Sequence, residues 1–115
     1  MSSYRLLLCA MLVLGGTAAR AADAPKPTVA QYLATCDEAM TAACTLPIDI
    51  NMTAIAMTEN LKGEAATGIC LPTDADFLSR AHSEVFAWLK AHPEVAQKSE
   101  DDGIVAAATA LYPCR

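Results

Sequence analysis

Apolar residues recur at helical spacing along most of the chain, and no stretch alternates between apolar and polar residues as a half-buried strand would. Stop and start signals divide the pattern into four predicted helices. The first opens at a capping box in which Thr28 is the N-cap and Gln31 stands three residues later. The expected inner face of this helix consists of Val29, Tyr32, Leu33, Cys36 and Met40.

A break over residues 44–47 separates the first predicted helix from the second. Pro47 is expected in the first turn of the second helix, where its missing N–H leaves no intrahelical hydrogen bond unmade. Gly63 is a natural stop, with Lys62 favourably placed near the negative end of the helix dipole. The apolar positions between these signals include Ile48, Met52, Ile55 and Leu61.

The third predicted helix is capped by Thr73, with Asp74 and Asp76 in its first turn, where the helix dipole favours negative charge. It ends at His92, because the residue before Pro93 is pushed out of the helical region. Its apolar stripe consists of Phe77, Ala81, Val85, Trp88 and Leu89.

Ser99 opens the fourth predicted helix, and the acidic residues 100–102 complement the dipole in its first turn. The expected inner face consists of Ile104, Val105, Ala108, Leu111 and Tyr112. The chain shows no internal repeat. The pattern therefore predicts an all-α fold, a small four-helix bundle in one domain.

The first 21 residues have the three parts of a secretory signal peptide. Arg5 supplies the positive charge, residues 6–14 are apolar, and residues 19–21 form a small-x-small cleavage site. The apolar run is shorter than the ~20 residues that a membrane-spanning helix needs. We therefore expect residues 1–21, including Cys9, to be removed as a signal peptide, and residues 22–115 to form an exported domain that is periplasmic or secreted.

Four cysteines follow the leader, and they are Cys36, Cys44, Cys70 and Cys114. An even number in a short exported chain indicates a disulfide framework without a free thiol. Four cysteines allow three pairings, and the sequence alone does not select one. Antiparallel packing of the last two helices would bring Cys70 beside Cys114, and a turn would bring Cys36 beside Cys44. Topology therefore favours these two disulfides.

Charge limits the classes of partner. Without the leader the chain has six basic and thirteen acidic residues, which gives a net charge near −7. Nucleic acids and anionic membrane surfaces both attract basic patches, so we expect neither as a partner. A basic protein partner is compatible with this charge.

Nothing in the sequence indicates a catalytic or metal site. His82 and His92 are expected at the surface or at a helix end, and Ser79 and Ser83 near His82 lack a third, orienting residue. No CxxC motif occurs, and neither histidine lies beside a cysteine. We therefore predict a protein that is not an enzyme and needs no cofactor or metal.

The C-terminal half resembles the Rap/Tai family, the immunity proteins that protect bacteria from type VI secretion amidase toxins. The motifs that carry the resemblance are Ile69-Cys70-Leu71-Pro72, residues 88–94 (Trp-Leu-Lys-Ala-His-Pro-Glu) and an Ala-rich segment, residues 107–114, that ends in Tyr-Pro-Cys. The leader, the size and a first helix that contains Cys36 also agree. One departure is that Cys44 is followed by residues 45–47 (Thr-Leu-Pro), where such proteins typically have an aromatic residue and a glycine.

The resemblance implies a periplasmic, all-helical protein, often a homodimer, that binds and blocks a peptidoglycan-cleaving amidase toxin. Two alternatives come from other classes. One is an acid-stress chaperone similar to the small HdeA-type periplasmic proteins, in which the thirteen carboxyl groups would act as a pH switch. The other is an envelope protein with a different partner.

The best candidate for the partner-binding surface is the loop after the second predicted helix. Its small side chains and the flanking Gly63 would let a backbone segment enter a narrow cleft, and Cys70 would anchor its base, which limits the entropy lost on binding. The candidate loop consists of Glu64, Ala65, Ala66, Thr67 and Gly68.

Overall fold

The computed structural model describes residues 25–37, 39–63 and 66–115. These residues form four α-helices and no strand. The helices are α1 (Val29–Thr35), α2 (Ala42–Lys62), α3 (Phe77–Ala91) and α4 (Glu100–Leu111), and the 3-10 helix η2 (Pro93–Val95) joins α3 to α4. The all-α fold with two disulfides is therefore confirmed. The predicted signal peptide lies outside the described residues, and within them no helix is long and apolar enough to cross a membrane.

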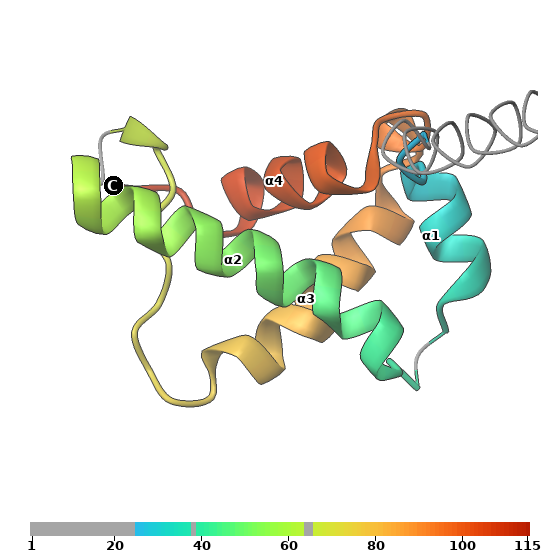
Figure 1. The fold of residues 1–115 in the computed structure, drawn as a ribbon, viewed down its shortest axis with the longest axis horizontal. Coiled ribbons are helices and arrows are strands. Elements are labelled where there is room, and N and C mark those ends of the chain that lie inside the picture. The colour runs from blue at the N-terminus through green and yellow to red at the C-terminus, as the bar shows by residue number, and fades with distance from the viewer. Residues whose placement is uncertain (1–24, 38, 64–65) are drawn as a thin grey trace, which may run out of the picture.

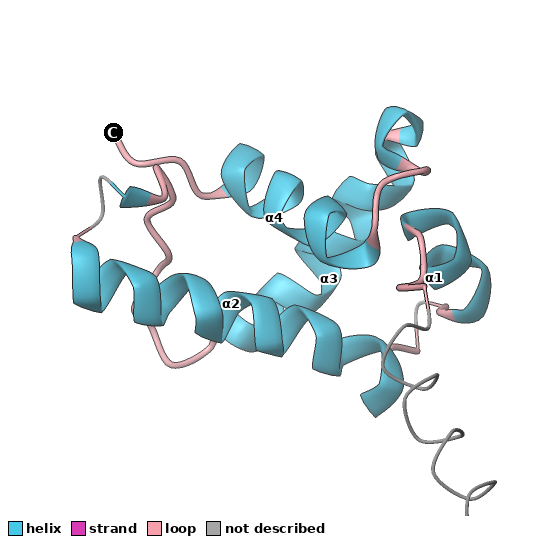
Figure 2. Ribbon diagram, turned by 45° about the horizontal axis from the view of Figure 1, so that its top comes forward, coloured by secondary structure: helices cyan, strands magenta, loops and turns pink. Residues whose placement is uncertain are grey.

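The helices form one small bundle around a shared core. Figure 1 shows α2 across the face nearest the viewer, α3 and α4 behind it, and α1 at the end away from the C-terminus. The same arrangement is visible in the tilted view of Figure 2. The largest fully buried side chains come from all four helices, and they are Val29, Ile48, Met52, Val85, Leu89 and Ile104.

The capping box at the start of α1 is present as predicted. Thr28 Oγ1 accepts a hydrogen bond from Gln31 N, and the Gln31 side chain accepts one from Thr28 N. The helix is shorter than expected, because it ends at Thr35. Cys36 is its C-cap, and Met40 lies in the turn beyond, so neither belongs to the helix face to which the sequence assigned them.

The expected break at residues 44–47 is wrong, because α2 already begins at Ala42. Pro47 lies inside the helix, in its second turn, and the missing N–H leaves the exposed Ala43 carbonyl to solvent. Packing accounts for the earlier start. Cys44 is buried, its carbonyl accepts a hydrogen bond from the Tyr32 hydroxyl, and its sulfur is bonded to Cys36. At the other end Gly63 is the C-cap, as predicted.

The predicted start of α3 is also wrong. Asp76 is the N-cap and Phe77 the first helical residue, so Thr73 and Asp74 precede the helix. The Asp74 carboxylate binds Arg80. The predicted stripe is buried at four positions, Phe77, Ala81, Val85 and Leu89. Trp88 is only half-buried, and Phe86, which the predicted stripe omitted, is buried. The helix ends at His92 as predicted.

Helix α4 begins at the Ser99 cap, whose hydroxyl accepts a hydrogen bond from Asp102 N. Ile104, Ala108 and Tyr112 are buried as expected, but Val105 is exposed and Leu111 is half-buried. Gly103 lies against Val29 so closely that a Cβ atom would collide with the valine side chain. This glycine therefore allows α1 to pack directly on α4.

Candidate functional site

The candidate loop leaves α2 at Gly63 and returns to the core at Ile69. Glu64 and Ala65 lie outside the described residues, Ala66 and Gly68 are exposed, and Thr67 is half-buried. Gly63 and Gly68 have φ angles of 85° and 70°, in a region that residues with a Cβ rarely adopt. A Cβ atom added at either glycine would have no neighbour within 4 Å, so the backbone conformation, not close packing, requires glycine here.

The base of the loop is tied to the C-terminal end of the chain. Cys70 N donates to the Tyr112 carbonyl at 2.8 Å, and Cys114 N donates to the Gly68 carbonyl at 3.1 Å. These bonds flank an isolated antiparallel bridge between Ile69 and Pro113. The disulfide between Cys70 and Cys114, with a Cα–Cα distance of 4.8 Å, closes the same connection. The described end of the loop, residues 66–68, thus leads directly into a cross-linked base.

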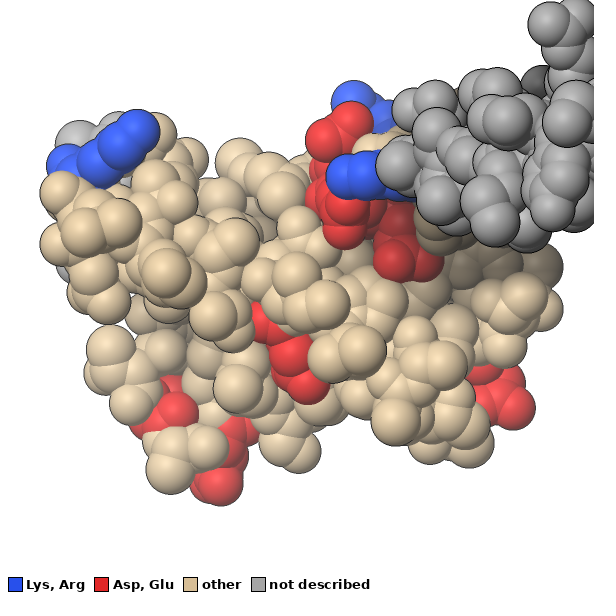
Figure 3. Space-filling model, viewed as in Figure 1, with Lys and Arg blue, Asp and Glu red and all other residues tan. Residues whose placement is uncertain are grey.

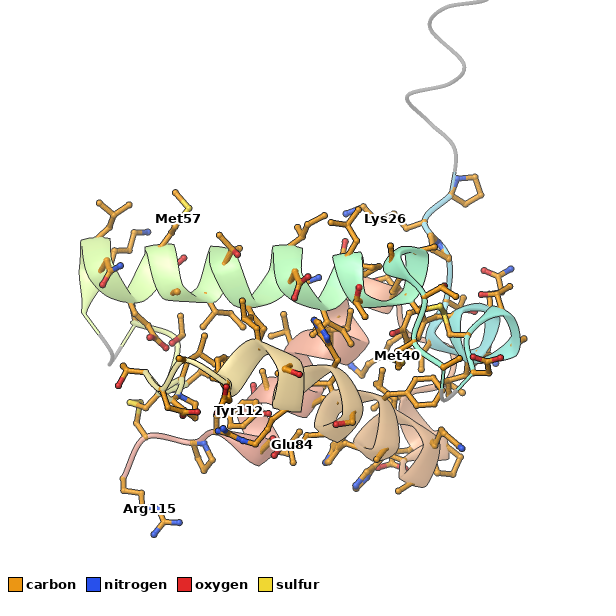
Figure 4. The ribbon with its side chains drawn as sticks, turned by 90° about the horizontal axis from the view of Figure 1, so that it is seen from below. Lys26, Met40, Met57, Glu84, Tyr112 and Arg115 are labelled. Atoms are coloured by element: carbon orange, nitrogen blue, oxygen red, sulfur yellow. A yellow bond between two sulfur atoms is a disulfide. The ribbon has the colours of Figure 1, made fainter. Side chains whose placement is uncertain are left out.

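Tyr112 fixes this base to α3. Its ring lies edge-on to Phe77, with the centroids 5.2 Å apart, and its hydroxyl donates to the Glu84 carboxylate. Figure 4 shows the two labelled side chains, Tyr112 and Glu84, next to each other. Burial, and then the hydrogen bond to Glu84, raise the pKa of Tyr112 well above its ordinary value. The tyrosine therefore remains a neutral donor at physiological pH.

A second cross-link lies at the opposite end of the bundle, between Cys36 and Cys44, with a Cα–Cα distance of 5.8 Å. Between these cysteines the chain turns back on itself, and Met40 adopts a φ of 47°. The Tyr32 hydroxyl donates to the Cys44 carbonyl at 2.7 Å. Burial, followed by the nearby Glu100, raises the pKa of Tyr32 to about 12. Both disulfides thus pair as the helix topology favours.

The histidines serve structural roles. The Asp49 carboxylate of α2 lies 2.6 Å from His82 Nε2 of α3, and the pair is half-buried, so His82 ties two helices together and is less exposed than expected. His92 stacks on Trp88 and contacts Glu94 at 2.6 Å. The Ser83 hydroxyl donates to the Arg80 carbonyl. No group of three potential metal ligands occurs among the described residues.

Sequence reasoning missed one surface, the outer side of α2. Leu46, Ile50, Met57 and Leu61 are between 57% and 80% exposed, although their residue types are typical of a core. In Figure 3 the area over α2 is almost free of charged residues, which lie at its margins. Apolar residues occur on both sides of this helix in the sequence, but only one apolar set was expected. That set included Leu61, which the structure places on the exposed side, apart from the buried Ile48, Met52 and Ile55.

Comparison with known families identifies the chain. The model of a family described as Rap1a immunity proteins matches residues 6–114, a span that contains all four helices and both disulfides. Comparisons with curated proteins and with solved structures gave no match. The match covers nearly the whole chain. This protein therefore belongs to the family of Rap1a immunity proteins, which indicates a role in immunity against a toxin.

Proposed function

We propose that this protein is an exported immunity protein that binds and blocks a peptidoglycan-cleaving amidase toxin of a type VI secretion system. The observation that carries the proposal is the family match over residues 6–114. It favours immunity over the acid-stress chaperone, because the matched family is described by its immunity function.

Two features support export to the periplasm, where such a toxin would act on the cell wall. The family match includes residues 6–14, the apolar part of the predicted signal peptide. Disulfides form and persist in oxidising compartments such as the bacterial periplasm, and the structure contains two.

The candidate loop, residues 64–68, is the segment that we propose enters the toxin's active-site cleft. An inhibitor that plugs a cleft benefits from a segment whose conformation is set before binding, because less entropy is then lost. The cross-linked base between Gly68 and Cys114 provides such a restraint. The net charge of the chain would also steer a basic toxin towards it.

The test uses the purified protein and a peptidoglycan amidase toxin from the same genome, with peptidoglycan hydrolysis as the readout. Ala66→Trp places a bulky side chain on the exposed part of the loop, so we expect the inhibition constant to rise by roughly 100-fold or more. Gln97→Trp is the matched control, because Gln97 is also exposed in a turn but lies between η2 and α4. Circular dichroism checks that both variants keep the helical fold.

The outcomes separate the proposed function from the proposed surface. If the wild-type protein does not inhibit the amidase, the proposed function is wrong. If the wild-type protein inhibits and the folded Ala66→Trp variant inhibits equally well, the toxin binds a different surface.

A further inference from the structure

A cleft of about 400 Å³ lies between the C-terminal half of α2 and the segment that joins the candidate loop to α3. In Figure 1 this segment runs past α2 to the start of α3. Met52 and Phe77 form the floor of the cleft, since they are only 1% and 6% exposed, whereas Met57 and Leu78 are exposed at its rim. The volume lies in the usual range of small-ligand sites, about 300–1,000 Å³, so the cleft has room for a side chain of another protein.

The cleft contains an acidic group that the chain leaves without a partner. The Oε1 atom of Glu59 is buried and has no hydrogen-bond partner among the described residues. A carboxylate oxygen in this situation is costly, because it loses its hydrogen bonds to water and gains none in return. Glu59 itself is half-buried and lines the cleft, so a ligand in the cleft can reach its carboxylate. The unpaired oxygen therefore indicates a group that binds there.

The lining indicates the chemistry of that group. Thr53, Asn60 and Thr73 add further oxygen acceptors to the carboxylate of Glu59, and the remaining lining residues are apolar. A guanidinium group has several N–H donors in one plane and no acceptor, and its methylene stem packs well on apolar surface. An arginine side chain therefore matches both the acceptors and the apolar walls. A lysine fits less well, because its ammonium group is a compact, strongly hydrated charge.

The chain does not supply this cation itself. The residues that line the cleft, all of which the structure describes, include no lysine, arginine or histidine. Arg80 of α3 binds the Asp74 carboxylate, and Lys62 in the last turn of α2 is exposed and does not line the cleft. The cation therefore comes from another molecule. The net negative charge of the chain favours the approach of a basic one.

The cleft adjoins the candidate loop. Leu71 and Pro72 belong to its lining, and they directly follow Cys70, whose disulfide closes the base of the loop. A partner held at the loop would therefore have its surface beside the cleft. Arginine side chains that enter a pocket of the partner are among the residues that contribute most to the affinity of protein complexes.

We propose that this cleft binds an arginine side chain of a partner protein, with the guanidinium on Glu59 and the stem on Met52 and Phe77. The inference rests on the proposed function in one respect, since we take the partner to be the toxin. It adds a charged anchor beside residues 64–68. The chemistry of the cleft is tested without the toxin.

The first experiment titrates the purified protein with n-butylguanidinium, an analogue of the arginine side chain, and follows backbone amide shifts by NMR. We expect the shifts to concentrate on the lining of the cleft. n-Butylurea has nearly the same shape without the charge, so it should bind at least about 10-fold more weakly. Glu59→Gln keeps the size of the side chain and removes its charge, so it should weaken n-butylguanidinium binding by at least about 10-fold.

Glu94→Gln is the matched control. It also removes one carboxylate, but Glu94 is exposed in η2, beyond the end of α3, whereas the cleft lies at its start. Binding of n-butylguanidinium to this variant should equal that of the wild-type protein. Shifts spread over the acidic surface, or equal binding by Glu59→Gln and the wild type, would overturn the proposal.

The stability of Glu59→Gln separates a binding role from a structural one. The substitution removes a buried charge and breaks no hydrogen bond of Oε1, so the urea midpoint should be at least as high as that of the wild type. A lower midpoint would show that Glu59 supports the fold, which would overturn the proposal.

The second experiment measures inhibition of the amidase toxin by the same variants. Glu59→Gln should raise the inhibition constant by at least about 10-fold, and Glu94→Gln should leave it unchanged. If the wild type inhibits and the folded Glu59→Gln variant inhibits equally well, the toxin does not use the cleft, and this inference is wrong while the proposed function stands. If the wild type does not inhibit, the proposed function is wrong, and the titration alone decides whether the cleft binds a guanidinium group.

Discussion

The two disulfide regions are built alike, although they lie at different ends of α3. In each, a buried tyrosine beside the disulfide meets a phenylalanine of α3 edge-on. Tyr112 contacts Phe77 at the start of the helix, and Tyr32 contacts Phe86 near its end, with centroid distances of 5.2 and 6.2 Å. In each, the tyrosine hydroxyl also donates a hydrogen bond that holds neighbouring chain segments together.

The regions differ in what the disulfide encloses. Cys70 and Cys114 are 44 residues apart, and their bond encloses α3, η2 and α4. Cys36 and Cys44 are 8 residues apart, and their bond encloses the connection from α1 to α2 and the first two residues of α2. Closing a longer loop removes more conformational entropy from the unfolded chain. The first disulfide therefore mainly stabilises the bundle, whereas the second mainly shapes the turn between α1 and α2.

Removal of the C-terminal disulfide should have the largest effect. With Cys70→Ala and Cys114→Ala together, the loop-entropy relation predicts a loss of about 4 kcal/mol in the free energy of unfolding. Urea unfolding followed by circular dichroism measures this loss. A loss no larger than that caused by removing the other disulfide would contradict the comparison.

Removal of the N-terminal disulfide should cost less. For Cys36→Ala with Cys44→Ala the same relation predicts about 2.5 kcal/mol. The helix content should hardly change, because the enclosed segment contains only the connection between α1 and α2 and the first two residues of α2. Urea unfolding under the same conditions allows the two losses in the free energy of unfolding to be compared. A change in the circular dichroism spectrum of the folded protein would show that this disulfide supports more than the connection between α1 and α2.

Alkaline pH should ionise Tyr32 and Tyr112, the buried tyrosines of the two regions, at different pH values. Of the three changes, this one should alter stability least. A tyrosine in the unfolded chain loses its proton near pH 10, whereas the raised pKa of Tyr32 lets it keep its proton up to about pH 12 in the folded protein. The folded state then binds more protons, so the free energy of unfolding falls as the pH rises through this window. The pKa of Tyr112 is raised further, so Tyr32 should ionise first.

Ultraviolet absorbance of tyrosinate, measured on residues 22–115, which contain Tyr32 and Tyr112 but not Tyr4, and on the Tyr32→Phe variant of the same domain, assigns the two titrations. The variant should lose the earlier step and keep the later one. Simultaneous ionisation of both tyrosines near pH 10 would show that burial does not protect them differently.

Local signals predicted the helix ends that depend on neighbouring residues. The capping box at Thr28, the Ser99 cap, the Gly63 stop and the end of α3 at His92 are all correct. Two starts were wrong. Pro47 appeared to open a helix, but burial of Cys44 against Tyr32, a contact between two helices, extends α2 towards the N-terminus past the proline. Thr73 appeared to cap a helix, but α3 begins later, after Asp76, and the Asp74 carboxylate instead binds Arg80.

The sequence by itself determined the helical class, the family resemblance and a choice of three disulfide pairings, because these follow from periodicity, motifs and the number of cysteines. Only the tertiary structure decided which of the two apolar faces of α2 enters the core. Both faces have residues that favour burial, and a helix can turn only one of them towards α3 and α4. The face left outside, from Leu46 to Leu61, can therefore be identified only after the bundle has formed.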